Sequence, residues 1–186
     1  MALTYTPSPE FGQACPEFAL PSVDGQSFQL SDFTGTTALL VMFICNHCPY
    51  VKAIEDRIIR LARHIADNGG AVVAICSKDP AEYPEDAPEE LKKRWLEKNY
   101  GFPYLVDEQQ DVARSFGAVC TPDFFLYDKN MKLAYRGRLD DSWKDALKVD
   151  KQELKMAFEA IVENKLPAKD QVPSMGCSIK WKGTGG

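Results

Sequence analysis

The fold of this chain is decided by residues 38–50, which read ALLVMFICNHCPY. The apolar run from Ala38 to Ile44 is typical of a buried strand, and a helical pattern begins after Cys48. Such a strand delivers the Cys45-x-x-Cys48 pair to the first turn of a helix, where unpaired N–H groups and the helix dipole favour negative charge. We therefore expect a stabilised thiolate on Cys45, the nucleophile of thiol–disulfide exchange, and a resolving thiol at Cys48.

Three neighbouring residues, Asn46, His47 and Pro49, are expected to tune this pair. A partly protonated imidazole at His47 would stabilise a thiolate on Cys45 and raise the reduction potential of the couple. The alternative for His47 is an exposed polar residue at a helix N-terminus, without electrostatic consequence.

Further elements follow on both sides of this stretch. Asp24-Gly25 predicts a turn between short strands at 18–20 and 27–30. The helix after Cys48 ends at Asn68-Gly69-Gly70, and the apolar run 71–76 completes a βαβ unit with a right-handed crossover. The remaining predictions are a helix from an Asp86/Glu89 capping box to about 99, a strand at 103–106, a helix at 107–116, strands at 123–127 and 132–138, and a helix from an Asp150/Glu153 cap to Pro167.

This order of elements predicts an α/β fold of the thioredoxin-like type. We expect a three-layer sandwich with a mixed central sheet, an N-terminal β-hairpin and a C-terminal tail. The whole chain, 1–186, is predicted to be a single domain with its core at about 14–166. The tail, 167–186, shows no periodicity.

Composition and charge limit the classes of partner that the chain could bind and indicate its cellular compartment. The net charge of -5 and the absence of a basic stripe argue against nucleic acid and anionic membranes as partners. Residues 1–10 lack the charged and apolar regions of a signal peptide, and the longest apolar run ends at Cys45, so we expect a cytoplasmic protein. Because the cytosol is reducing, we do not expect the six cysteines to form three structural disulfides.

A second loop, Cys120-Thr121-Pro122, precedes a predicted strand. In a thioredoxin-type fold this loop faces the Cys-x-x-Cys, so the Thr121 backbone would pair with an extended substrate, and Pro122 would adopt the cis form. The alternative is a simple loop proline. Cys120 is either a third thiol at the site or a small buried hydrophobe, and Cys177 in the tail is an accessible resolving thiol.

Other reactive side chains carry weaker expectations. Glu82, Glu85 and Asp86 would supply a carboxylate for proton transfer at the second cysteine, but a solvated acidic loop is ranked first. Cys76 is expected in the core, and Cys15 has no assigned role.

The cysteine pair also allows a metal-binding alternative. Thiolates select Cu(I), so a copper-binding protein would use Cys45 and Cys48 with His47. Zinc would require two more ligands, and the chain has no second Cys-x-x-Cys and no paired histidines. We therefore expect no metal and no cofactor in the redox interpretation.

The motif FICNHCPYVKAIE at 43–55 resembles the bacterial thioredoxin-like proteins of the alkyl hydroperoxide reductase/thiol-specific antioxidant (AhpC/TSA) group, in the subfamily with CNHCPYV. Four other segments resemble the same subfamily: YPED at 83–86, CTPDFF at 120–125, YRGRLDD at 135–141 and PSMGC at 173–177. The resemblance implies a thioredoxin fold, a redox-active Cys45–Cys48 disulfide, a cis Pro122 opposite it and antioxidant activity.

Two positions depart from better-known relatives. Thioredoxin has a buried aspartate on the strand before its first cysteine, where this chain has Leu39. Peroxiredoxins have a threonine three residues before the peroxidatic cysteine, where this chain has Met42. We therefore expect a thiol–disulfide oxidoreductase acting on a protein or small-molecule disulfide with a thiol electron donor. The alternative is a thiol peroxidase with Cys45 as peroxidatic cysteine.

Overall fold

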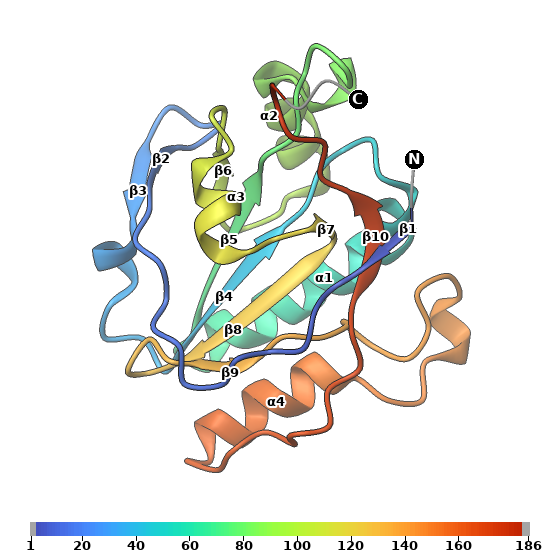
Figure 1. Cartoon of the computed structure of the whole chain (residues 1–186). Helices are drawn as coiled ribbons and strands as arrows, with labels where there is room; N and C mark the ends of the chain where they lie inside the picture. The colour runs from blue at the N-terminus through green and yellow to red at the C-terminus, as the bar shows by residue number, and fades with distance from the viewer. Residues whose placement is uncertain (1–2, 184–186) are drawn as a thin grey trace.

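A five-stranded mixed sheet forms the centre of the computed structural model, which describes residues 3–183 (Figure 1). Its order is β6-β5-β4-β8-β9. The central strand β4 is parallel to β5 and antiparallel to β8; β6 is parallel to β5, and β9 is antiparallel to β8. The bounds are β4 Ala38–Phe43, β5 Ala71–Cys76, β6 Tyr104–Val106, β8 Asp123–Asp128 and β9 Leu133–Tyr135.

Two apolar cores lie on opposite faces of this sheet. Alternate side chains of β4 point to opposite faces, so Leu40 and Met42 pack in one core and Leu39 and Val41 in the other. The first core contains α1 (Pro49–Asp67), α2 (Pro88–Lys98) and α4 (Glu153–Val162). The second contains α3 (Asp111–Phe116) and side chains from the hairpin β2 (Ala19–Pro21) and β3 (Ser27–Gln29). The predicted three-layer α/β fold and N-terminal hairpin are therefore confirmed.

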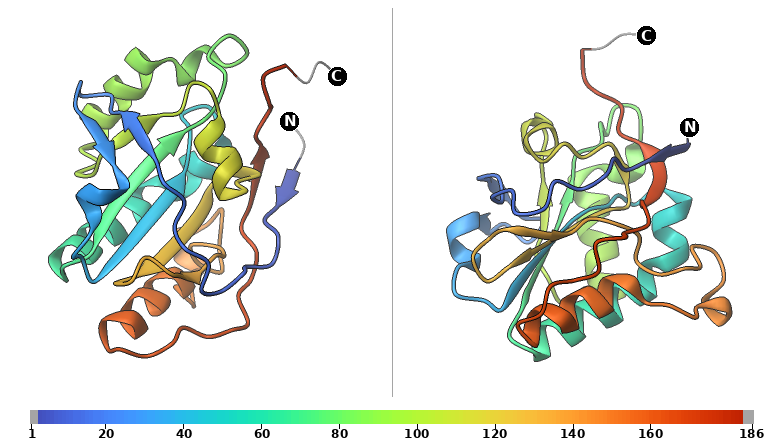
Figure 2. Two further views of the ribbon diagram at one scale, coloured as in Figure 1. Left: turned by 60° about the vertical axis from the view of Figure 1, so that its left-hand side comes forward. Right: turned by 60° about the horizontal axis from the view of Figure 1, so that its bottom comes forward.

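A second, smaller sheet joins the two end segments of the described chain. Its order is β1-β10-β7, with β1 at Leu3–Tyr5, β10 at Met175–Ser178 and β7 at Cys120–Thr121 (Figures 1 and 2). Both pairings of β10 are antiparallel. The tail was predicted without regular structure, and this is wrong for β10, because a four-residue strand paired with distant segments leaves no period in the sequence.

Two predicted helix caps are also wrong. Helix α2 begins at Pro88, and Asp86 lies before it in a short 3-10 turn, with its carboxylate directed elsewhere. Helix α4 has Gln152 at its N-cap without a side-chain cap, and the Glu153 carboxylate accepts hydrogen bonds from Arg138. The 3-10 turns span Leu30–Phe33, Pro84–Asp86 and Ala146–Lys148.

Within residues 3–183, none of the helices combines the length and the apolar character needed to cross a membrane.

Candidate active site

The cysteine pair lies where β4 ends and α1 begins. The backbone of β4 continues as far as Ile44, whose N–H donates to Ile75 O. Helix α1 then starts at Pro49, with Cys48 as its N-cap. Proline is favoured at the first helical position because its missing N–H is not needed there. The carboxyl end of a central parallel strand thus places both cysteines at an edge where several loops meet.

Three sulfur atoms gather at this point. The Sγ atoms of Cys48 and Cys177 lie 3.0 Å apart, and Cys48 Sγ lies 3.1 Å from Thr121 O. Cys45 Sγ lies 3.3 Å from the Thr121 hydroxyl. None of these three cysteines is in a disulfide, and their exposed fractions are no more than 1%. The structure therefore brings together the predicted residues Cys45, Cys48, Thr121 and Cys177 in a closed, reduced site.

The two cysteines of the pair differ in acidity, and Cys48 has the lower pKa. Burial holds the pKa of Cys45 well above its usual value, and the nearby Cys48 and Asp86 act in the same direction. Hydrogen bonding with Cys45 lowers the pKa of Cys48 to about 4, assisted by the Cys177 thiol and the Val51 N–H. In this closed arrangement the lower pKa belongs to Cys48, which lies at the N-terminus of the helix, where the first N–H groups are free. The thiolate expected on Cys45 stays a prediction for the open site.

Asp86 holds the loop between the two cysteines. Its Oδ1 atom accepts hydrogen bonds from the backbone N–H groups of Asn46 at 2.7 Å and His47 at 3.1 Å, and Oδ2 contacts His47 Nδ1. Asn46 also donates from Nδ2 to Glu90 O. The carboxylate is 2% exposed, so the solvated-loop interpretation is wrong for Asp86. Three hydrogen bonds to one buried carboxylate fix the conformation of the loop.

His47 is enclosed rather than exposed. The Tyr83 ring stacks on its imidazole with centroids 3.9 Å apart and planes within 1° of parallel. Its Nε2 atom is buried and has no hydrogen-bond partner among residues 3–183. Ligand atoms of Cys45, His47 and Asp86 lie within 4.8 Å of one another, a set that offers a metal one thiolate, one imidazole and one carboxylate. A closed zinc site would need a fourth ligand.

The second predicted loop faces the cysteines. The peptide bond between Thr121 and Pro122 is cis. The edge of β7 is not free for a substrate, since Cys177 and Ser178 of β10 already pair with Thr121 and Cys120. In this conformation β10 occupies the edge at which the Thr121 backbone is expected to pair with a substrate.

Pairing at this edge depends on a close backbone approach. A Cβ atom at Gly176 would lie 1.9 Å from Thr121 O, so only glycine fits there. The Ser174 hydroxyl donates to Pro122 O at 2.9 Å. Lys78, which follows β5, is 5% exposed, and its Nζ donates to the carbonyls of Cys177 at 3.3 Å and Ser178 at 2.7 Å.

Comparisons with known proteins agree with this geometry. The model of the AhpC/TSA family matches residues 11–136. The chain belongs to the AhpC/TSA family. It is 23% identical over 130 residues to the thiol-disulfide oxidoreductase ResA of Bacillus thuringiensis subsp. konkukian, with 67% of each chain covered.

Two solved structures are similar to this AhpC/TSA protein over different lengths. An uncharacterized conserved protein from Geobacillus kaustophilus is 42% identical with a TM-score of 0.94, covering 100% of this chain and 99% of that one. The thioredoxin domain of a thiol-disulfide oxidoreductase from Bacteroides vulgatus is 21% identical with a TM-score of 0.59, covering 69% of this chain and 89% of that one. These similarities establish a thioredoxin-like fold, and the ResA match supports a thioredoxin-like redox function.

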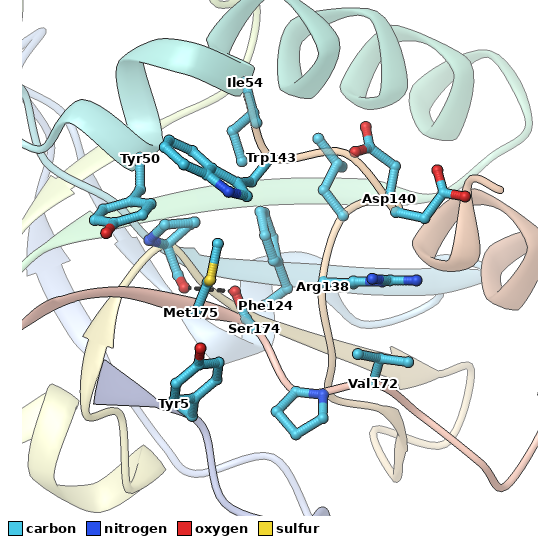
Figure 3. A pocket seen from close by; sticks show the side chains of 14 residues that line it. Tyr5, Tyr50, Ile54, Phe124, Arg138, Asp140, Trp143, Val172, Ser174 and Met175 are labelled. Carbon is cyan, nitrogen blue, oxygen red and sulfur yellow. Dashed lines mark hydrogen bonds between the residues drawn. The ribbon is translucent and has the colours of Figure 1, made fainter. Parts of the chain in front are cut away.

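A cavity of about 150 Å³ adjoins the cis peptide bond of this AhpC/TSA protein (Figure 3). Its walls are mainly apolar and aromatic, with Tyr50 and Trp143 on one side and Tyr5 and Met175 from the smaller sheet on another. Pro122 also lines the cavity, so the cavity borders the loop that faces the cysteines. The Trp143 and Tyr50 rings are in contact, with centroids 4.8 Å apart.

Two residues of the site were missed at the sequence level. Lys78 follows the carboxyl end of a predicted parallel strand, and that position was a usable signal. Tyr83 lies in the YPED segment, but its stacking on a histidine 36 positions earlier has no local signature. The remaining cysteines, Cys15, Cys76 and Cys120, are buried, and burial raises the pKa of each thiol.

Proposed function

We propose that this protein is a thiol–disulfide oxidoreductase in which Cys45 and Cys48 alternate between dithiol and disulfide. The observation that carries the proposal is the position of both thiols at the head of α1, within 3.3 Å of atoms of Thr121. A thioredoxin-like fold with a cis Thr121–Pro122 bond and the ResA relative support it.

The proposed reaction moves two electrons from the cysteine pair to a substrate disulfide. Cys45 transfers its proton to the Cys48 thiolate and attacks one substrate sulfur, which breaks the substrate S–S bond and releases the first thiolate. That thiolate takes the proton from Cys48. The Cys48 thiolate then attacks Cys45 Sγ, releases the second substrate thiolate and leaves a Cys45–Cys48 disulfide, which a thiol donor reduces.

The surrounding charges control where the thiolate forms. Proximity to Asp86 raises the pKa of Cys45, whereas the Lys78 ammonium lowers it. In the closed arrangement burial dominates, and Cys45 stays protonated. Solvent or substrate entering the site removes part of that burial, so we expect Cys45 to become nucleophilic only when the site opens.

We place the substrate along Thr121 and Pro122 with a neighbouring side chain in the cavity. The substrate backbone would take the edge of β7 after β10 has moved away. Aromatic walls and a volume of about 150 Å³ suit one apolar side chain. The proposed partners are therefore a protein or small-molecule disulfide and a thiol electron donor, with the reducing cytosol as the proposed compartment.

Disulfide reduction by three variants tests the proposal. With insulin as substrate and dithiothreitol as donor, we expect turnover by wild type and no turnover above the uncatalysed rate by Cys45→Ser. We expect Cys48→Ser to accumulate a mixed disulfide on Cys45, which intact-mass measurement detects. Cys15→Ser is the matched control, because Cys15 lies buried in the opposite core. Full activity in Cys45→Ser would refute the assignment.

One contact favours thiol peroxidase activity as a second candidate. The apolar run before Cys45 lacks a hydroxyl, but Thr121 Oγ1 lies 3.3 Å from the Cys45 sulfur and would orient a peroxide. Cys45 would then become a sulfenic acid with release of an alcohol or water, and Cys48 would displace water to form the disulfide. Rapid peroxide consumption lost in both Cys45→Ser and Thr121→Val would support this candidate.

Metal content distinguishes either enzyme from the copper alternative. Stoichiometric copper or zinc in protein purified from the cell, lost together in Cys45→Ser and His47→Ala, would favour the metal interpretation. A metal-free protein that reduces disulfides would favour the enzyme.

A further inference from the structure

Strand β10 occupies the place proposed for a substrate strand. It pairs antiparallel with β7, with Cys177 opposite Thr121, directly before the cis Pro122 (Figures 1 and 2). A cysteine-containing substrate bound by β-augmentation would present its backbone to this same edge. The chain therefore supplies its own cysteine-bearing strand to the site.

This placement is fixed by several independent contacts. Gly176 allows the backbone of β10 to approach Thr121 O. The buried Lys78 ammonium donates hydrogen bonds to the backbone carbonyls of Cys177 and Ser178. On its other edge β10 pairs with β1 from Leu3 to Tyr5. Cys177 is 1% exposed, so its thiol faces the other two sulfurs rather than solvent.

The sulfur atoms are close enough for exchange. The Cys48–Cys177 distance of 3.0 Å must shorten by about 1 Å to reach a disulfide bond length of about 2.05 Å. Cys48 lies between two thiol neighbours, since it also hydrogen bonds with Cys45. A disulfide that includes Cys48 therefore has two possible partners within the chain.

We propose that Cys177 is a third redox-active residue, which takes over the disulfide from Cys45 by forming a Cys48–Cys177 bond. This deepens the proposed function, because the Cys45–Cys48 disulfide made in turnover is the source of oxidation. The Cys177 thiolate attacks Cys48 Sγ, the Cys45–Cys48 bond breaks, and the Cys45 thiolate takes the proton that Cys177 released. No net oxidation occurs in this step, and the same thiol donor later reduces the new disulfide.

The transfer has two consequences for the cycle. Cys45 returns to the thiol form while the protein still holds the oxidising equivalents. Strand β10 is then tied covalently to the head of α1, which keeps the edge of β7 closed to another substrate until a donor has acted. Cys177 is thus an internal substrate and links reduction by the donor to reopening of the site.

Cross-link mapping in a variant without Cys15 and Cys45 tests the proposal. The first lysine or arginine of the chain is Lys52, so trypsin leaves Cys15, Cys45 and Cys48 on one peptide, residues 1–52, and Cys177 on residues 170–180. In the full-length Cys15→Ser/Cys45→Ser variant, a link between these two peptides joins Cys48 to Cys177. We would oxidise the folded variant with diamide, quench with N-ethylmaleimide and identify the linked peptides by mass spectrometry.

We expect the 1–52/170–180 link in this variant and its complete loss when Cys177→Ser is added. In wild type oxidised by hydroxyethyl disulfide, we expect both Cys45–Cys48 and Cys48–Cys177 bonds. After further chymotryptic digestion, the first bond lies within the peptide 44–50, and the second links that peptide to 170–180. The proposal would be overturned if the Cys15→Ser/Cys45→Ser variant, shown to be folded by circular dichroism, gave only diamide or N-ethylmaleimide adducts.

This result is independent of the proposed enzymatic activity. If insulin reduction fails while the Cys48–Cys177 link forms, the oxidoreductase assignment is wrong and the reactive pair stands. If wild type reduces insulin and no link forms in either protein, Cys177 is only a hydrogen-bond neighbour of Cys48.

Discussion

The two walls of the cysteine site differ in how firmly they are held. The sheet wall is made of β4 and α1. All six residues of β4 are buried; all six pair with β8, and five of them pair with β5. The terminal wall, made of β1, β10 and β7, rests on two residue pairs at β7 and three at β1, and Leu3 and Tyr5 are 49% and 60% exposed.

This difference assigns separate tasks to the two walls. The reactive thiols Cys45 and Cys48 belong to the sheet wall, where global stability holds their positions. Segments with few buried contacts open at lower free energy than the core, so the terminal wall is the part that controls access. Substitutions in one wall therefore test whether the other wall is affected.

The largest expected effect is electrostatic and belongs to the sheet wall. Because the pKa of Cys48 is lowered from 9.0 to about 4, we expect one thiolate at pH 7, detected by its ultraviolet absorbance. The signal should fall as the pH decreases through about 4 and should be absent at pH 7 in Cys48→Ser. Cys15→Ser should leave it unchanged, since burial raises the pKa of Cys15 to about 12. An unchanged signal in Cys48→Ser would place the charge on another residue.

A matched pair of leucine substitutions compares the stability of the walls. Leu40→Ala removes a side chain that is 1% exposed in β4, and we expect a loss of about 2–5 kcal/mol in the free energy of unfolding. Leu3→Ala in β1 should cost less than about 0.5 kcal/mol, because Leu3 is half exposed. Urea denaturation measures both, and equal losses would contradict the distinction between the walls.

Displacing β10 should expose the thiols without unfolding the core. Gly176→Ala places a Cβ atom 1.9 Å from Thr121 O, and strain of about 1.4–3 kcal/mol would raise the open population about 10- to 100-fold. We expect N-ethylmaleimide to react with Cys48 faster by that factor. Gly12→Ala is the control for backbone strain alone, since Gly12 has a φ of +80° but nothing lies within 4 Å of an added Cβ atom. An unchanged alkylation rate would mean that another segment controls access.

The smallest expected effect concerns Asp86. Its carboxylate contributes to the raised pKa of Cys45, so Asp86→Asn should lower that pKa. The pH dependence of Cys45 alkylation in a Cys48→Ala background measures the shift. Glu85→Gln removes a neighbouring charge that is exposed and paired with Lys52, and it should leave the profile in place. A profile that moves equally in both variants would indicate a general charge effect.

The sheet wall could be predicted from sequence because its signals are local. A run of apolar residues, a proline after Cys48 and a helical apolar period lie within a few turns of one another, so β4, α1 and the cysteine pair were placed correctly. The helix start after Cys48 was also predicted correctly. The burial that raises the pKa of Cys45 has no local signal, because it depends on segments distant in sequence.

The terminal wall could not be predicted because its contacts are distant in sequence. Cys177 pairs with Thr121 and with Leu3, and no period in residues 175–178 reports either partner. Asp86 was interpreted as a helix cap on local grounds, while its carboxylate binds the backbone of Asn46 and His47. The sequence pattern predicted a local helix cap for Asp86, whereas its carboxylate binds the backbone of a residue 40 positions earlier.

The pairing of β1 with β10 has a practical consequence for how the protein is handled. Strands β1 and β10, from opposite ends of the described chain, pair next to the cysteines. We therefore expect a purification tag or fusion partner at either end to disturb the strands that close the site. Activity measured on tagged protein would then report the disturbance of β10 together with the chemistry of Cys45. Tag-free protein, or a tag inserted in an exposed turn such as Asp24-Gly25, separates the two.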